Sequence, residues 1–227
     1  MQQLYIIINM KKIENNTFFQ EKMMRNGYSK DRFARFSKYA NDAKLSLSFG
    51  YTTKGTCYLN FFIDFPKVEM IIKEIGDFQV PQIGGNTGYL LADKKFKEWS
   101  VDVIDERTNT PLVLDDILKT AEQYVFPILN RYSEIKSLLL DYENGLLPKV
   151  FRIEERLLPV LYFVAGEKKH SVELLDIIID KYSIMDDGIN LSYQENNGKE
   201  VLSTEKLVSS QYIDFATKMK AYVLGTS

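Results

Sequence analysis

The chain has 227 residues and a formal net charge of -2, and it contains one cysteine and one histidine. Its 45% hydrophobic and 26% charged residues are typical of a globular protein, which excludes wholesale disorder and membrane embedding. The lone Cys57 and lone His170 exclude a disulfide framework, a CxxC zinc pair and a multi-histidine zinc site. The lack of disulfides favours a reducing, cytoplasmic compartment.

The first twelve residues, MQQLYIIINMKK, contain an apolar run that is too short to span a bilayer and has no basic stretch before it. We therefore expect neither a signal peptide nor a membrane partner. The sequence leaves both Met1 and Met10 open as the start of translation.

Residues 13–40 predict a short helix followed by a strand. Apolar residues recur at helical spacing over residues 13–27, and Gly27 ends the pattern. The next stretch, YSKDRFARFSKYA, fits either period, but a strand is favoured because Phe33, Arg35, Ser37 and Tyr39 would share one face.

A β-hairpin follows. Apolar residues alternate with small or polar ones from Leu45 to Tyr51, and apolar residues again recur at every second position from Cys57 to Phe65. TTKGT lies between the two runs, so we expect an antiparallel pair joined by a turn. Pro66 then opens a short helix that ends at Gly76.

The glycines of QIGGNTGYLLADKKF raise the question of a phosphate-binding loop. GGNTG lacks the spacing of a dinucleotide fingerprint, and Gly88 is followed by Tyr89 rather than by the Lys-Ser or Lys-Thr of a Walker loop. We instead expect Gly84, Gly85 and Asn86 to turn a corner, because these residue types tolerate positive φ.

A further strand, in which Trp99, Val101 and Val103 share a face, precedes the change to helical spacing at Thr110. Pro127 should kink or restart the helix that begins there. Ser133 is the expected cap of the next helix, which Gly145 ends.

The remaining chain predicts helices. Pro148 opens KVFRIEERLLPVLYFVAG, with an internal proline and an end at Gly166; EKKHSVELLDIIIDKY forms its hairpin partner; and a last amphipathic helix follows a loop. Strands thus gather in the first half and helices in the second, which predicts an α+β fold with a curved antiparallel sheet packed against helices. We divide the chain into residues 1–145, mixed sheet and helices, and residues 146–227, a helical hairpin with a C-terminal helix, the two packed as one continuous unit.

Acidic residues are the first candidate site. They gather at Asp102, Asp105 and Glu106 and again at Asp115 and Asp116. Paired acids can bind a hard cation or divide acid and base roles, whereas acids in a first helical turn also complement the helix dipole. Two interpretations therefore stand beside a solvated face: a surface that binds a basic protein partner, or a carboxylate site for a divalent metal in an enzyme.

A basic and aromatic stretch is the second candidate. Lys30, Arg32, Arg35 and Lys38 alternate with aromatic residues, a composition that suits single-stranded nucleic acid if the rings are exposed. The alternative is that the rings belong to the core and the cations form a solvated face. His170 lies in a polar stretch, and no Gly-x-Ser-x-Gly elbow accompanies it, so we expect it to be solvated rather than catalytic.

The order of several segments resembles a known family. The segments are MMRNGYSK, LSLSFGY, CYLNFFIDF, KEWSVDVIDERTNTPLVLDDILKTAEQYVFPILNRYS and LLPVLYFVAG. In this order, from Ile13 to Tyr182, they resemble an uncharacterised bacterial family of α+β proteins, some of which occur among toxin-immunity proteins. The family has no assigned catalytic residues, so the resemblance implies none here.

These observations lead to one functional hypothesis and two alternatives. The first is a non-enzymatic cytoplasmic binding protein of the immunity type, which would inhibit a basic protein toxin through its acidic residues and would need no cofactor. The alternatives are the metal-dependent enzyme and, third, a nucleic-acid-binding protein that uses residues 30–39.

Overall fold

The computed structural model describes residues 13–53, 55–76, 79, 82–91, 97–100, 110–187 and 204–225. The expectations for residues 1–12, for Val101 and Val103 and for the loop after residue 187 lie outside these ranges. The chain divides into two compact units, the first made of Met1–Pro66 and Gln82–Arg152 and the second of Lys67–Pro81 and Ile153–Ser227.

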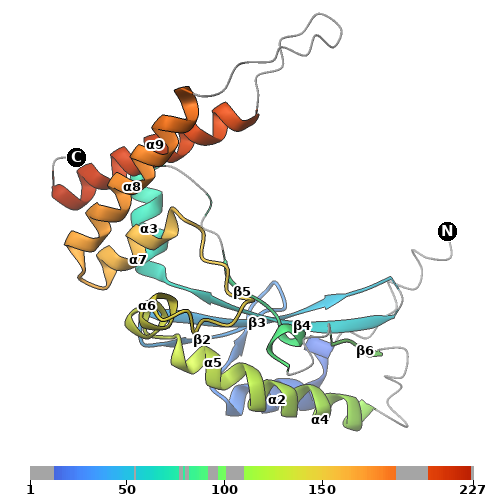
Figure 1. Ribbon diagram of the computed structural model, residues 1–227. Coiled ribbons are helices and arrows are strands. Elements are labelled where there is room, and N and C mark those ends of the chain that lie inside the picture. The colour runs from blue at the N-terminus through green and yellow to red at the C-terminus, as the bar shows by residue number, and fades with distance from the viewer. Residues whose placement is uncertain are drawn as a thin grey trace, which may run out of the picture. The chain divides into compact units, whose positions relative to one another are not determined.

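The first unit contains an open antiparallel sheet. Its strands follow the order β1 (Ser29–Lys30), β2 (Phe36–Ala40), β3 (Ala43–Tyr51), β4 (Thr56–Asp64) and β5 (Ile83–Asn86), and β6 (Trp99–Ser100) also pairs with β4. All these pairs are antiparallel. Figure 1 shows helices α2, α4 and α5 of the same unit on one side of this sheet.

The predicted hairpin of β3 and β4 is confirmed, and it forms the centre of the sheet. Leu45 pairs with Ile63 and Leu47 with Phe61, and all four side chains are almost fully buried. The residues between them on β4 are only half-buried, so the alternation in the sequence marks the two faces of the sheet.

The N-terminal helix is also confirmed. A 3-10 turn, η1 (Ile13–Asn15), leads into α2 (Thr17–Arg25), whose N-cap Asn16 accepts a hydrogen bond from the Phe19 amide at 3.1 Å. Gly27 follows the helix with φ +81°. The predicted strand after it is split into β1 and β2, because Asp31 Oδ1 accepts hydrogen bonds from the amides of Phe33 and Arg35 and turns the chain there.

Pro127 restarts its helix, as the sequence predicts. Helix α4 (Thr110–Thr120) continues into a π-helical segment, η3 (Ala121–Val125), and α5 (Phe126–Arg131) begins one residue before the proline. The π-helical turn is wider than an α-helical turn, so it accommodates Pro127, which has no amide hydrogen and whose ring crowds the preceding turn.

The predicted cap of α6 (Ile135–Glu143) is wrong. Ser133 Oγ donates to the Asn130 carbonyl at 2.7 Å and accepts from Asn41 Nδ2 at 2.7 Å, so it joins α5 to the turn after β2. The Ile135 amide instead donates to the Asp42 carboxylate at 3.3 Å. A partner distant in sequence thus replaces the local one.

Two further expectations are corrected in the first unit. Gly84, Gly85 and Asn86 do not turn a corner: they form β5, because their backbone pairs with Asn60, Phe61 and Phe62 of β4, and the turn is the following 3-10 helix η2 (Thr87–Leu90).

The helix expected from Pro148 is absent over residues 147–156, and α7 begins only at Leu157. Phe151 is instead buried against Phe61 and Tyr132, which the helical period does not foresee.

The second unit is helical. It contains α7 (Leu157–Val164), α8 (Lys168–Asp187) and α9 (Thr204–Leu224). It also contains α3 (Pro66–Ile75) from Lys67 onward, because Pro66 is the last residue of that segment of the first unit. Ser171 Oγ donates to the Pro159 carbonyl at 2.8 Å and joins α7 to α8, which confirms the predicted helical hairpin. Lys220 pairs with Asp176, and the rings of Tyr182 and Tyr212 lie 4.3 Å apart, so α9 packs along α8.

The fold is α+β, with an antiparallel sheet in the N-terminal half and helices dominating the C-terminal half, as predicted. In the part of the chain that the structure describes, no helix combines the length and the apolarity needed to cross a membrane.

Candidate functional site

The acidic candidate residues are only partly described. Asp102, Asp105 and Glu106 lie outside the described residues, whereas Asp115 and Asp116 lie on α4. Asp116 Oδ2 accepts a hydrogen bond from Trp99 Nε1 at 2.7 Å and forms an ion pair with Lys97 Nζ at 3.1 Å. Burial alone would raise the pKa of Asp116, but the hydrogen bonds from Trp99 and Lys97 outweigh it and hold the pKa below its usual range. This carboxylate therefore joins β6 to α4.

The basic candidate residues do not form one row. Lys38 Nζ lies 4.7 Å from the ring of Tyr28, which stacks on Phe126 on the helix-covered side of the sheet. Burial there lowers the pKa of Lys38. Lys30 Nζ donates to Asn15 at 2.7 Å, also near the N-terminal helix.

The two arginines of this stretch lie elsewhere. Arg32 stacks over Phe33 in the turn, and Arg35 lies 5.4 Å from the ring of Phe62, which points to the opposite face from the buried Phe61 and Ile63. The exposed rings at Phe33 and Tyr39 are present, but Lys38 and Arg35 lie on opposite faces of the sheet.

No metal centre is formed by the described residues. Among them, no group of three or more His, Cys, Asp or Glu side chains is arranged to hold a metal ion.

His170 lies in the first turn of α8, exposed, with its ring 4.3 Å from that of Tyr162 and its Nδ1 3.7 Å from Glu173. Cys57 is fully buried, and burial raises the pKa of its thiol to about 12, so it is not poised as a nucleophile.

The first unit contains a groove large enough to bind a ligand. It has a volume of about 970 Å³ and is partly open to solvent. That volume lies near the upper end of the roughly 300–1,000 Å³ of pockets that hold small ligands. It is lined by residues from β5, from η2 and the residue after it, from α5, and from the 147–152 segment: Gly84, Gly85, Asn86, Tyr89, Leu90, Leu91, Ile128, Leu147, Pro148, Lys149, Val150 and Arg152.

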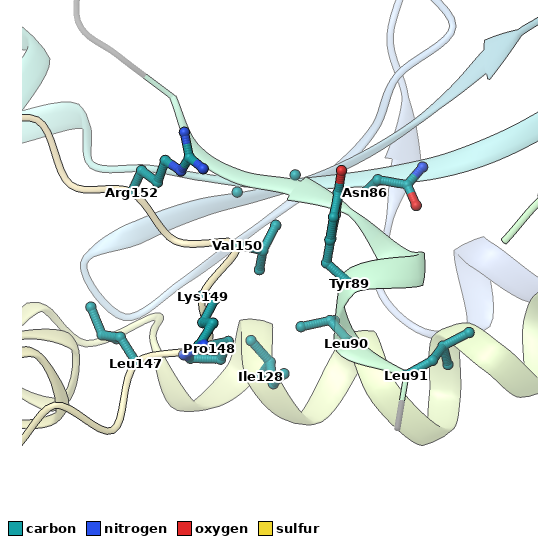
Figure 2. A pocket seen from close by; sticks show the side chains of 12 residues that line it. Asn86, Tyr89, Leu90, Leu91, Ile128, Leu147, Pro148, Lys149, Val150 and Arg152 are labelled. Atoms are coloured by element: carbon teal, nitrogen blue, oxygen red, sulfur yellow. The ribbon is translucent and has the colours of Figure 1, made fainter. Parts of the chain in front are cut away.

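One wall of the groove is β5 with η2. Thr87 Oγ1 donates to the Leu59 carbonyl at 2.8 Å, and Asn86 Oδ1 accepts from the Gly88 amide at 2.7 Å. The first bond attaches η2 to β4 and the second caps η2 at the end of β5, so that Tyr89 and Leu90 lie beside the groove (Figure 2). Asn86 is itself buried, and its Nδ2 has no hydrogen-bond partner in the described part of the chain.

The opposite wall is the 147–152 segment. Phe151 anchors it, with ring centroids 5.6 Å from Phe61 and 5.3 Å from Tyr132, and the Phe151 amide donates to the Pro148 carbonyl at 2.9 Å. The segment approaches β5 closely at Gly85, where a Cβ atom would lie 2.3 Å from Val150 Cγ2. Figure 2 shows Leu147 and Val150 on this side and Ile128 of α5 below.

The groove combines an apolar floor with a basic rim. Lys149 and Arg152 are exposed, and within the described residues neither forms an ion pair or a side-chain hydrogen bond. The lining contains no carboxylate, imidazole, thiol, serine or threonine. Such a site can bind an apolar group next to a negative charge, but it offers neither the nucleophile and base pair nor the two carboxylates that acyl transfer or hydrolysis commonly use.

The sequence does not predict this groove, because its residues come from three separate stretches, 84–91, 128 and 147–152, and share no period. One feature points to it: paired glycines within a strand often mark a place where another backbone or a ligand approaches closely.

No family model, curated protein or solved structure matches the chain.

Proposed function

We propose that this protein is a non-catalytic binding protein whose groove in the first unit takes an acidic and apolar segment of a protein partner. The observation that carries the proposal is the combination of the apolar lining with the two rim cations, Lys149 and Arg152, that are unpaired among the described residues. Elsewhere in this unit the exposed Arg131 does have a partner, because its guanidinium pairs with the buried carboxylate of Asp141 at 2.7 Å.

Electrostatic complementarity supports an acidic partner at this site. Two cations beside an apolar surface, with no partner among the described residues, favour encounter with a negative segment, while burial of apolar side chains supplies the larger part of the affinity. The immunity-type inhibitor with a basic partner, expected from the five acids, stays a prediction: three of them lie outside the described residues, and Asp116 is engaged with Trp99 and Lys97.

Site-specific crosslinking in host cells tests the proposal. Benzoylphenylalanine replaces Tyr89, which is exposed at the groove, or Tyr39, which is exposed on the sheet outside it. We expect a discrete protein adduct from position 89 and none from position 39. The adduct should also disappear in the Lys149→Glu/Arg152→Glu variant.

The matched control reverses two other exposed cations of the first unit, Arg25→Glu/Arg32→Glu, and should leave the adduct unchanged. A position-89 adduct that persists in the groove variant, or no adduct at position 89 at all, would contradict the proposal. Recovery of a partner by itself does not support it, because only the dependence on Lys149 and Arg152 locates the contact.

A further inference from the structure

Strand β5 is an edge strand, and its edge borders the groove. It pairs with β4 alone among the described strands, through residues Ile83 to Asn86. An edge strand presents every second backbone N–H and C=O group outward, where another chain can pair with it. Gly84 and Gly85 carry no side chains that would keep such a chain away.

The groove lies where the side chains of an added strand would point. Successive side chains of a strand alternate between the two faces of its sheet. A strand placed beside β5 would therefore direct every second side chain toward the side on which Ile128, Leu90 and Leu147 line the groove. These are apolar residues, so they fit apolar side chains of the added strand.

The rim cations select the charge of that strand. Lys149 and Arg152 lie in the same lining as the β5 glycines and are unpaired among the described residues. An Asp or Glu side chain of an added strand, or a terminal carboxylate, would complement them.

We infer that the segment bound in the groove is an extended peptide of a partner protein that adds to the sheet as a strand along the outer edge of β5, with apolar side chains in the groove and carboxylates that complement the two cations of the lining, Lys149 and Arg152. This inference rests on the proposed function, and it adds the mode of binding and the chemistry of the partner segment. A small amphiphile would use the same lining but would not need the β5 backbone.

Peptide selection provides the probe. Random heptapeptides are displayed on phage and selected on the full chain, and the most enriched peptide is synthesised with a fluorescent label for polarisation titrations. We expect alternating apolar residues with at least one Asp or Glu, and binding about tenfold weaker to Lys149→Glu/Arg152→Glu than to the wild type. The Arg25→Glu/Arg32→Glu control should bind as the wild type does. No enrichment, or equal affinity of all three proteins, overturns the inference.

Backbone methylation then separates strand pairing from simple occupation of the groove. The selected peptide is made with one N-methyl group at a time, which removes a single donor and leaves every side chain in place. Strand addition predicts that methylation at every second position weakens binding about tenfold, because only those amides face β5. Methylation at the positions between them should have a much smaller effect.

Equal sensitivity at all positions, with the dependence on Lys149 and Arg152 retained, overturns strand addition but leaves the proposed function intact. If position 89 also fails to crosslink a partner, the proposed function fails as well. Sedimentation equilibrium of the peptide-free protein should show a monomer. Self-association that the groove variant abolishes would make a second copy the occupant and would overturn the inference.

Discussion

The two walls of the groove are held in place by different means. Strand β5 is positioned by backbone pairing with β4 and by the absence of side chains at Gly84 and Gly85. The 147–152 segment has no such pairing in the sheet and is positioned by the side chain of Phe151, which is buried against two aromatic rings. Substitutions that add atoms should therefore destabilise the β5 wall, and substitutions that remove atoms should destabilise the opposite wall.

The largest expected effect is on the wall held by a side chain. Phe151→Ala removes a buried ring and should lower the free energy of unfolding by about 3 kcal/mol. Leu147→Ala, in the same segment but half-buried at the groove, should cost less than about 1 kcal/mol. Urea unfolding followed by circular dichroism measures both. Equal costs would show that Phe151 does not anchor the wall.

Adding one atom to β5 should have the next largest effect. Gly84 has φ +155°, and a Cβ atom there would lie 2.1 Å from the Phe61 carbonyl oxygen, so Gly84→Ala should destabilise the protein by roughly 2 kcal/mol. Gly145 also has positive φ, but nothing lies within 4 Å of its Cβ position. Gly145→Ala should therefore cost less in the same assay. A Gly84→Ala protein as stable as the wild type would contradict the close pairing of β5 with β4.

The contact between the walls gives a smaller and non-additive effect. Gly85→Ala should cost about 1 kcal/mol, because the new methyl group meets Val150 Cγ2. Val150→Ala removes that group, so the double variant should lose less stability than the sum of the two single variants, by about 1 kcal/mol. A double-mutant cycle in urea measures this coupling. Strict additivity would place the two residues out of contact.

The smallest effect on stability is expected at the rim. Lys149 and Arg152 form no ion pair among the described residues, so Lys149→Glu/Arg152→Glu should change the free energy of unfolding by less than about 0.5 kcal/mol. Thermal and urea unfolding should nearly overlay those of the wild type. A large loss of stability would mean that these charges serve the fold rather than a partner.

Local patterns in the sequence predict the centre of the first unit and most helices. The alternation in β3 and β4, the glycine after α2 and the proline in α5 each act on neighbouring residues, so their consequences can be read without the fold. The α+β class follows from where these patterns lie along the chain.

The groove could not be predicted in the same way, because both of its walls contradict their local patterns. Gly84 and Gly85 suggest a turn, but pairing with β4 makes them a strand. Residues 147–156 have helical spacing, but burial of Phe151 between Phe61 and Tyr132 holds them extended or turned. In both cases a partner distant in the sequence overrides the local preference.

The charged residues show that the sequence also does not predict which charges are available to a partner. Asp115 and Asp116 are adjacent and look equivalent in the sequence, but Asp116 binds Trp99 and Lys97. No pattern in the sequence distinguishes Lys149 and Arg152 from other cations, yet they are unpaired among the described residues at the rim of an apolar groove. Which charges are available to a partner depends on tertiary contacts.

Chemical-shift mapping tests the central claim most directly. Deuterated, ¹⁵N-labelled protein is titrated with the phage-selected peptide, and the amide shifts are followed in two-dimensional spectra. The account predicts that the largest changes fall on residues 83–91, on Ile128 and on residues 147–152. Changes concentrated instead at Asp115 and Asp116, at residues 30–39 or in the helical second unit would contradict it.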